Sequence, residues 1–154
     1  MKEIVRFIAT GAYSGYFPIV AGTIGTIPAW FIAWFFLSDP IVLIIATIVT
    51  IAVSVWSAGR AESFLGHDAK KIVIDEWAGM FVSLLFLPHR LDVYIAAFVF
   101  FRFFDVIKPY PSGKAESWPR GWGITFDDIF AGIYANLICQ LGLLILRQLH
   151  WLGF

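Results

Sequence analysis

Two long apolar stretches limit what this chain can fold into. Residues 41–58 and residues 129–146 contain no charged side chain, and each stretch is 18 residues long. A helix needs about 20 mostly apolar residues to cross about 30 Å of hydrocarbon. Because 60% of all residues are hydrophobic and only 14% are charged, the chain also lacks the polar side chains of a water-facing surface. The sequence therefore predicts an integral membrane protein.

The other apolar segments predict an all-α, polytopic protein with about five membrane-embedded helices in a single domain, residues 1–154. The N-terminal MKEIVRFIATG combines Glu3 and Arg6 with apolar side chains, which favours a short amphipathic helix at the membrane interface. The apolar runs 77–87 and 93–104 are shorter than the hydrocarbon layer. Each must be extended by a turn or more to span, which brings the charged residues at their outer ends to the membrane boundary.

Glycine and proline interrupt the first apolar segment, residues 15–37. We expect regular helix only in its second half, beginning near Pro28, because the missing N–H of proline costs nothing in a first turn. Residues 23–26 are then a glycine-containing loop that leads into a helix N-terminus, where free N–H groups favour an anion. A close packing contact between helices is the other explanation for these small residues.

The distribution of Lys and Arg predicts an orientation. If Arg102 at a helix end is left out, alternate sides of the expected topology carry eight and two basic residues. By the positive-inside tendency the N-terminus is cytoplasmic and the C-terminus is outside. The segments that carry the acidic pairs then face the cytoplasm.

Composition also excludes some classes of protein. Eleven basic residues balance eleven acidic residues, and no basic tract with interleaved aromatic residues occurs, so we expect no nucleic-acid partner. The single cysteine, Cys139, excludes an internal disulfide and a multi-cysteine metal site. No pattern in the sequence predicts the oligomeric state.

Carboxylates from three separate segments lie at the ends of apolar runs, where charge is costly in a membrane. At one membrane depth they repel one another unless a cation holds them together. Oxygen ligands of this kind suit Mg²⁺ or Mn²⁺, commonly with a substrate phosphate. The residues concerned are Asp75, Glu76, Asp105, Asp127 and Asp128.

Basic and glycine-rich segments favour phosphate as the substrate group. Lys and Arg neutralise phosphate oxygens, and a glycine segment at a helix N-terminus supplies N–H donors. Together with the acids they indicate phosphate chemistry on a lipid headgroup. The candidate substrate-binding residues are Gly22, Thr23, Gly25, Thr26, Lys71 and Arg102, with Lys108 as a catalytic cation.

Each acidic pattern also has a purely structural explanation. The pair Asp127 and Asp128 is typical of N-terminal caps of the last helix, and the acidic pair after residue 74 is typical of the same device one helix earlier. Arg102 and Asp105 have the spacing of an i,i+3 ion pair. These alternatives stay open at the level of sequence.

Among phosphatase chemistries, metal-activated attack of water fits best. The chain has no DxDxT motif, and Cys139 has no arginine at the short spacing of a cysteine phosphatase. Lys114 stands where histidine-dependent lipid phosphatases carry the histidine of a PSGH motif. The alternatives from other classes are a small cation channel or transporter with carboxylates at its helix ends, and a structural membrane protein.

Four segments in order resemble the bacterial phosphatidylglycerophosphatase A family: GYFPIVAGTIGT at 15–26, IDEWAG at 74–79, FRFFDVIKPYP at 101–111 and GITFDDIFAG at 123–132. The resemblance implies Mg²⁺-dependent hydrolysis of phosphatidylglycerophosphate to phosphatidylglycerol and phosphate, in phospholipid biosynthesis. It also implies a multi-pass protein of the bacterial inner membrane with its active site facing the cytoplasm.

The matching positions assign roles to particular residues. All five acids match acidic positions of the family, and Lys108 matches its basic position. The residues that match its glycine segment are Gly22, Thr23, Gly25 and Thr26. We expect Asp105 or Asp128 to orient the attacking water, while Lys108 and the glycine segment hold the phosphate. The expected metal ligands are Asp75, Glu76, Asp127 and Asp128.

Overall fold

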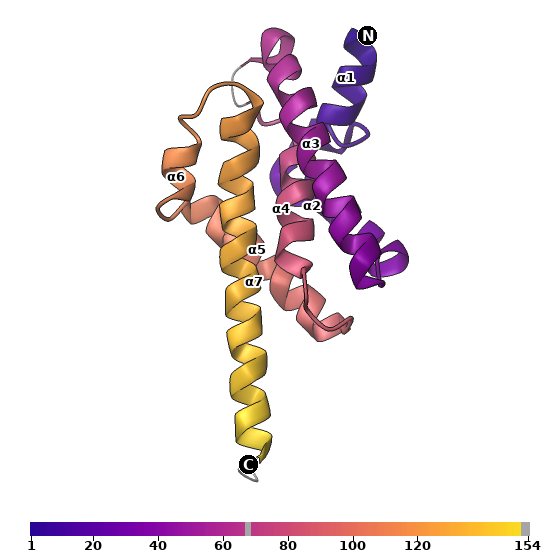
Figure 1. Cartoon of the computed structure of the whole chain (residues 1–154). Helices are drawn as coiled ribbons and strands as arrows, with labels where there is room; N and C mark the ends of the chain where they lie inside the picture. Colours follow the sequence, from indigo (N-terminus) through magenta and orange to yellow (C-terminus); the bar gives the residue numbers. More distant parts are fainter. Residues whose placement is uncertain (67–68, 152–154) are drawn as a thin grey trace.

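The computed structural model describes residues 1–66 and 69–151 of the chain, and every regular element in these residues is helical (Figure 1). The predicted all-α fold is therefore confirmed. The elements are α1 (Lys2–Ala9), the 3₁₀ turn η1 (Ser14–Tyr16), α2 (Ala21–Phe36), α3 (Pro40–Leu65), α4 (Ile74–Leu84), α5 (Leu91–Ile107), α6 (Ser112–Ala115) and α7 (Gly121–Trp151).

Two of these helices, α3 and α7, are long and apolar enough to cross a membrane, and α2 is a shorter apolar helix. Five spanning helices are therefore not confirmed. Helix α3 ends at the same end of the molecule where α7 begins, so the two run in opposite directions (Figure 1). Asp39 starts α3 as its N-cap, because its Oδ1 accepts hydrogen bonds from the backbone N–H groups of Ile41 at 2.8 Å and Val42 at 3.1 Å.

The prediction that helix begins near Pro28 was wrong. Helix α2 begins at Ala21 and includes Pro28, so residues 23–26 are helical and not a loop. The glycines lie within this helix and do not break it. Their role is to leave room for neighbouring segments. A Cβ on Gly25 would lie 2.7 Å from the Cβ of Val73, so the glycine lets α2 approach the segment before α4.

The last helix also begins earlier than predicted. Helix α7 starts at Gly121, so Asp127 and Asp128 lie in its second turn and are not N-terminal caps. The first residue of α7 packs closely against α3. A Cβ on Gly121 would lie 2.2 Å from the Val55 carbonyl oxygen and 2.6 Å from the Gly59 nitrogen, which only glycine permits.

Helix α4 is short and lies against α7. It extends toward its N-terminus as predicted and includes Asp75 and Glu76, but it ends at Leu84 and not at Leu87. At 1.5 Å per residue its 11 residues give about 16 Å, too little to cross a bilayer alone. Its C-terminal carbonyl groups are satisfied by Asn136 of α7, whose Nδ2 donates to Ser83 O at 3.0 Å and Leu85 O at 2.7 Å.

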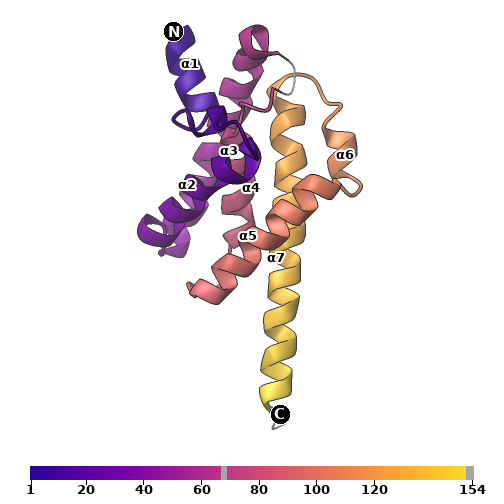
Figure 2. The same cartoon turned by 180° about the vertical axis from the view of Figure 1, so that it is seen from behind.

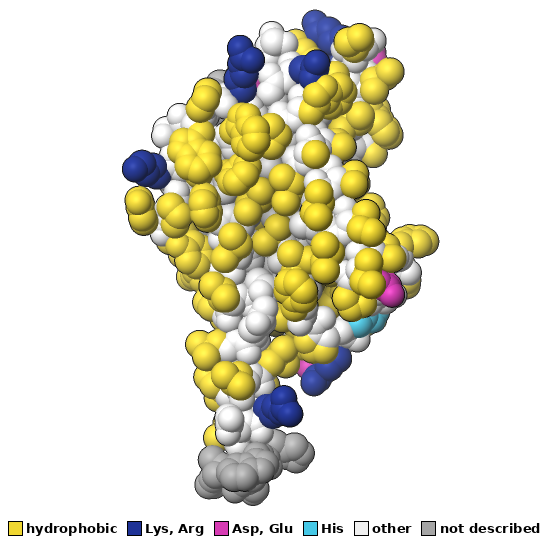
Figure 3. Space-filling model, in the orientation of Figure 1, with side chains coloured by type: hydrophobic (Ala, Val, Ile, Leu, Met, Phe, Trp, Pro, Cys, Tyr) yellow, Lys and Arg dark blue, Asp and Glu magenta, His cyan; other side chains and the backbone are white. Residues whose placement is uncertain are grey.

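The outer surface is largely apolar. Figure 3 shows hydrophobic side chains over most of the visible face, with Lys and Arg concentrated toward its upper and lower parts. In α3, the exposed Trp56 lies under the guanidinium of Arg60 at 4.7 Å, an arrangement typical of a membrane interface. These features, with the two apolar helices, indicate a membrane-associated protein.

Candidate active site

The N-terminus of α2, the N-terminus of α4, the C-terminal part of α5 and the second turn of α7 surround one cavity of about 910 Å³. The structure brings all five predicted carboxylates to this cavity. The three cations singled out in the sequence also line it. These eight residues are Asp75, Glu76, Asp105, Asp127, Asp128, Lys71, Arg102 and Lys108.

Arg102 joins two of the carboxylates. Its Nη1 lies 3.1 Å from Glu76 Oε2 and 2.7 Å from Asp105 Oδ2, and its side chain is largely buried. The expected i,i+3 pair is therefore present, but it is part of a larger cluster. Thr26 of α2 donates a hydrogen bond from Oγ1 to Glu76 Oε2. Burial raises the pKa of Glu76 to about 8, although Arg102 and Thr26 oppose this rise.

Lys108 forms the second cluster at the end of α5. Its Nζ lies 2.8 Å from Asp127 Oδ2 and 3.2 Å from Glu116 Oε1. Burial alone would lower the pKa of Lys108, but the hydrogen bonds and charges of Asp127 and Glu116 raise it above its ordinary value. The other oxygen of Asp127 accepts the backbone N–H of Asp128 at 2.9 Å. Lys108 is therefore a permanent cation held against α7.

Two carboxylates have no cation of their own. In residues 1–66 and 69–151, no ion pair joins Asp75 or Asp128 to Lys or Arg. Asp75 Oδ1 is buried and has no hydrogen-bond partner among the described atoms. Burial and then the charge of Glu76 raise the pKa of Asp75 well above its ordinary value. Asp128 lies within hydrogen-bonding reach of Asp105. Asp75 and Asp128 are therefore the two carboxylates of the site that could hold a cation.

The donor chemistry fits a hard divalent ion, since carboxylate oxygens are the ligands that Mg²⁺ and Mn²⁺ prefer. As the side chains stand, no three acidic, histidine or cysteine residues in the described part of the chain form a ready-made metal site. Glu76 and Asp127 are engaged by Arg102 and Lys108, respectively. The oxygens of Asp75 and Asp128 are the ones left without such a partner.

The structure separates the predicted phosphate-binding residues into two groups. Gly22 lines the cavity, whereas Thr23, Gly25 and Thr26 are not among its lining residues. A Cβ on Gly22 would lie 2.5 Å from Arg102 Nη2, so this glycine makes room for the guanidinium. The first N–H groups of α2 have no partner within the helix and open on the cavity beside it.

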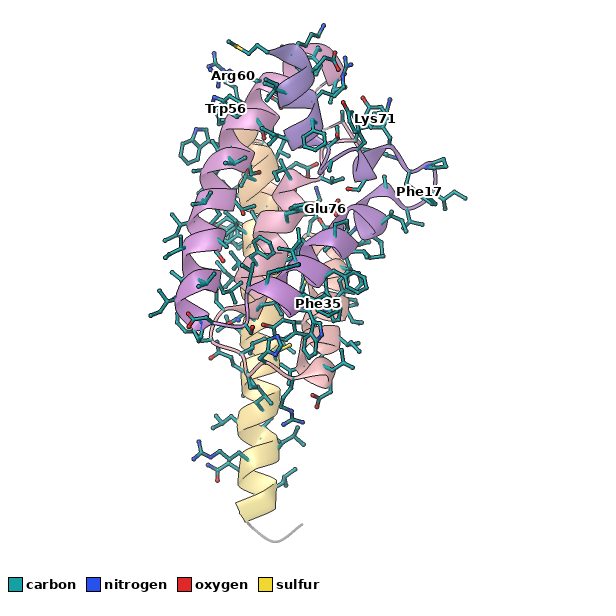
Figure 4. The ribbon with its side chains drawn as sticks, turned by 90° about the vertical axis from the view of Figure 1, so that its right-hand side faces the viewer. Phe17, Phe35, Trp56, Arg60, Lys71 and Glu76 are labelled. Atoms are coloured by element: carbon teal, nitrogen blue, oxygen red, sulfur yellow. The ribbon has the colours of Figure 1, made fainter. Side chains whose placement is uncertain are left out.

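Lys71 lies at the outer edge of the cavity. Its Nζ is 4.8 Å from the ring centroid of Tyr16, and Figure 4 shows Lys71 and Phe17 near the edge of the molecule, with Glu76 further in. Lys71 and Phe17 both line the cavity. The cavity therefore has a basic and aromatic rim, which includes Lys71 and Phe17. We call the carboxylates further in, among them Asp75 and Asp128, its acidic floor.

Two polar residues of the site were missed in the sequence. Lys70 lines the cavity together with Lys71. The only indication of this in the sequence was its position next to Lys71. Glu116 shares Lys108 with Asp127. It comes from the segment after α6, and nothing in its spacing indicated that this segment folds back on the end of α5.

Comparison with known proteins agrees with the geometry. The family model described as Phosphatidylglycerophosphatase A matches residues 7–143. Proteins named Phosphatidylglycerophosphatase A are similar to the chain: that of Escherichia coli is 34% identical over 98% of this chain and 87% of its own length, and that of Haemophilus influenzae is 32% identical over 87% and 85%.

A Bacteroides thetaiotaomicron protein, named provisionally as a phosphatidylinositol-3-phosphatase, is 34% identical over 85% of this chain and 88% of its own length. No solved structure matches the chain significantly. The family model covers all four segments that surround the cavity. The chain therefore belongs to the phosphatidylglycerophosphatase A family.

Proposed function

We propose that this protein is a lipid phosphatase that hydrolyses phosphatidylglycerophosphate to phosphatidylglycerol and phosphate in phospholipid biosynthesis. The observation that carries the proposal is one cavity in which five carboxylates and four cations meet, in a protein whose outer surface is largely apolar. Family membership and the printed names of two relatives support this substrate.

The chain's own residues provide a phosphate-binding surface. The N-terminus of α2 at Ala21 and Gly22 presents free N–H groups, and Lys71 adds a positive charge at the rim. Arg102 and Lys108 lie deeper, each already held by carboxylates. Since their positions are fixed before substrate binds, they stabilise charge that develops on the phosphate oxygens at little reorganisation cost.

We assign Mg²⁺ or Mn²⁺ to the acidic floor, with Asp75 and Asp128 as the leading ligands. Such an ion would offset phosphate charge and lower the pKa of a water bound to it. Glu76 and Asp127, also expected as ligands, have a second role because they position Arg102 and Lys108. Asp105 lies beside Asp128 and is anchored by Arg102, so it is placed to orient the attacking water and accept its proton.

We place the protein in the bacterial inner membrane as a multi-pass protein with the cavity on the cytoplasmic side. The excess of Lys and Arg in the segments on the side of the N-terminus supports this orientation. The lipid phosphate would then meet the rim at headgroup depth, where Lys71 and Phe17 lie.

The test is phosphate release by the purified protein in phosphatidylcholine vesicles. We expect release from phosphatidylglycerophosphate with Mg²⁺, and loss of release with a chelator. Asp75→Asn and Asp128→Asn should abolish turnover, whereas the matched change Asp92→Asn, in an exposed pair with Arg90, should not. Preferential turnover of phosphatidylinositol 3-phosphate would overturn the substrate. Cation flux without phosphate release would favour the channel or transporter.

A further inference from the structure

A second, smaller cavity lies between α2 and α5. Its volume is about 190 Å³, and all of its lining side chains are hydrophobic. This is below the roughly 300–1,000 Å³ of a pocket that encloses a whole small ligand. The cavity therefore suits part of an apolar chain. Its lining residues are Ile27, Trp30, Phe31, Ile95 and Phe98, and we call it the α2–α5 groove.

The groove lies close to the charged cavity, along the same two helices. Helix α2 leaves that cavity at Gly22, and α5 enters it at Arg102, where a Cβ on Gly22 would lie 2.5 Å from Arg102 Nη2. Ile27 is five positions further along α2, and Phe98 is four positions before Arg102, which is about 6 to 8 Å along each helix. Both helices lie in front of α4 in Figure 2. The apolar groove thus begins one to two helical turns beyond the Gly22–Arg102 contact.

The far end of the groove is fixed by Trp30. Its Nε1 donates a hydrogen bond to the carbonyl oxygen of Tyr94 in α5 at 2.9 Å, which ties the two helices together. The Trp30 ring also stacks on Trp34, with ring centroids 6.0 Å apart. The end wall is therefore held by both a hydrogen bond and aromatic packing.

The sides of the groove face outward. Phe31 of α2 and Ile95 of α5 are each 49% exposed, on a surface that would meet lipid. A polar ligand would gain no hydrogen bond from these apolar walls, and a protein partner would leave the position of the groove beside the charged cavity unexplained. A hydrocarbon chain attached to a phosphate-bearing headgroup satisfies both cavities at once.

We propose that the α2–α5 groove binds one acyl chain of the phospholipid whose phosphate occupies the charged cavity. This inference rests on the proposed function and adds to it a chain-binding subsite. The headgroup would lie in the charged cavity at the N-terminus of α2, and one acyl chain would lie along α2 and α5 beyond the Gly22–Arg102 contact. The groove then makes long-chain lipid phosphates better substrates than the same headgroup without acyl chains.

The first test fills the groove. Ile27→Trp should lower kcat/KM for long-chain phosphatidylglycerophosphate by about tenfold or more, as expected when a few methylenes lose apolar contact. Hydrolysis of the deacylated headgroup, glycerophosphoglycerophosphate, should stay within about twofold of the unmodified protein. The matched control is Ile48→Trp in α3, because Ile48 is an apolar side chain 63% exposed and outside the groove. Equal loss on both substrates, or no loss on either, contradicts the proposal.

The second test does not depend on turnover. A lipid phosphate with a diazirine in one acyl chain should cross-link peptides that contain Ile27, Phe31 or Ile95, and excess long-chain lipid phosphate should remove the label. Labelling spread evenly over the exposed faces of α3 and α7, or a groove covered by a second copy of the chain, would overturn the subsite. Labelled groove residues in a protein that releases no phosphate would reject the proposed function and keep the subsite.

Discussion

Arg102 Nη1 lies 3.1 Å from Glu76 Oε2, and this contact connects α5 with the first turn of α4. Both side chains are largely buried, so the pair can exist only with further partners. Asp105 on the next turn of α5 and Thr26 of α2 supply them. Three helices are thus held in register by one guanidinium at the wall of the cavity.

Gly22 is the residue that makes room for this arrangement. Gly22→Ala should displace Arg102 and Glu76, because the new Cβ would meet Arg102 Nη2 at 2.5 Å and Glu76 Oε1 at 2.7 Å. We expect kcat to fall at least about tenfold, which is a cost of about 1.4 kcal/mol in the transition state. Gly142→Ala in α7 is the control, since nothing lies within 4 Å of its Cβ position. Phosphate release and thermal unfolding of both variants check this; an unchanged kcat in Gly22→Ala contradicts it.

Thr26 should act through Glu76 and not on substrate. Its side chain is fully buried, it does not line the cavity, and its hydroxyl hydrogen-bonds Glu76. Thr26→Val should therefore lower kcat and destabilise the fold by about 1–2 kcal/mol, while KM changes little. Thr26→Ser keeps the hydroxyl and should retain activity. A rise in KM alone for Thr26→Val would instead place Thr26 against the phosphate.

The helical class and the grouping of the acids could be predicted from sequence because both depend on local patterns. Charge at the end of an apolar run is costly in a membrane, so each acidic pair needed a functional reason, and a shared site supplied one. Helix boundaries were harder to predict from the sequence. The sequence suggested a segment broken at Gly22, Gly25 and Pro28, yet α2 passes through all three positions. The two glycines are needed for a different reason, which is close contact with Arg102 and Val73. Contacts from distant segments carry no local signal.

The ion pairs within the site also could not be predicted from the sequence. Nothing in the spacing showed that Glu76 pairs with Arg102, or that Asp127 pairs with Lys108. Those pairs distinguish the acids that are paired with a cation from Asp75 and Asp128, which have no cation partner among the described residues. They therefore narrow the set of candidate metal ligands. Metal dependence itself stays a prediction.

Lys108 and Asp127 allow stability and catalysis to be separated. Lys108→Met leaves Asp127 largely buried and without its closest cation, so it should destabilise the fold and abolish turnover. Adding Asp127→Asn removes the unpaired charge. We expect the double variant to regain much of the thermal stability but none of the activity, because the phosphate still lacks its cation. Recovery of turnover in the double variant would show that Lys108 has a structural role only.

Asn136 should be a structural residue of α7. It donates hydrogen bonds to Ser83 O and Leu85 O at the end of α4, and its own side chain is buried. Asn136→Leu should cost about 1–3 kcal/mol of unfolding free energy for the unsatisfied carbonyl groups. Gln140→Leu, which loses only the bond from Nε2 to Asn136 Oδ1, is the milder control. Chemical denaturation in detergent measures both; equal stability of the two variants contradicts the capping role.

Asp75 and Asp128 should govern metal binding even without substrate. Mn²⁺ affinity of the purified protein, measured by electron paramagnetic resonance, should fall at least about tenfold in Asp75→Asn and in Asp128→Asn, since each change removes a charged oxygen ligand. Glu76→Gln should have a smaller effect, because Glu76 is already paired with Arg102. Asp92→Asn, outside the cavity, should bind Mn²⁺ like the unmodified protein. If Glu76→Gln weakened Mn²⁺ binding more than Asp75→Asn did, Asp75 would not be the leading ligand. Glu76 would then take its place as the metal ligand.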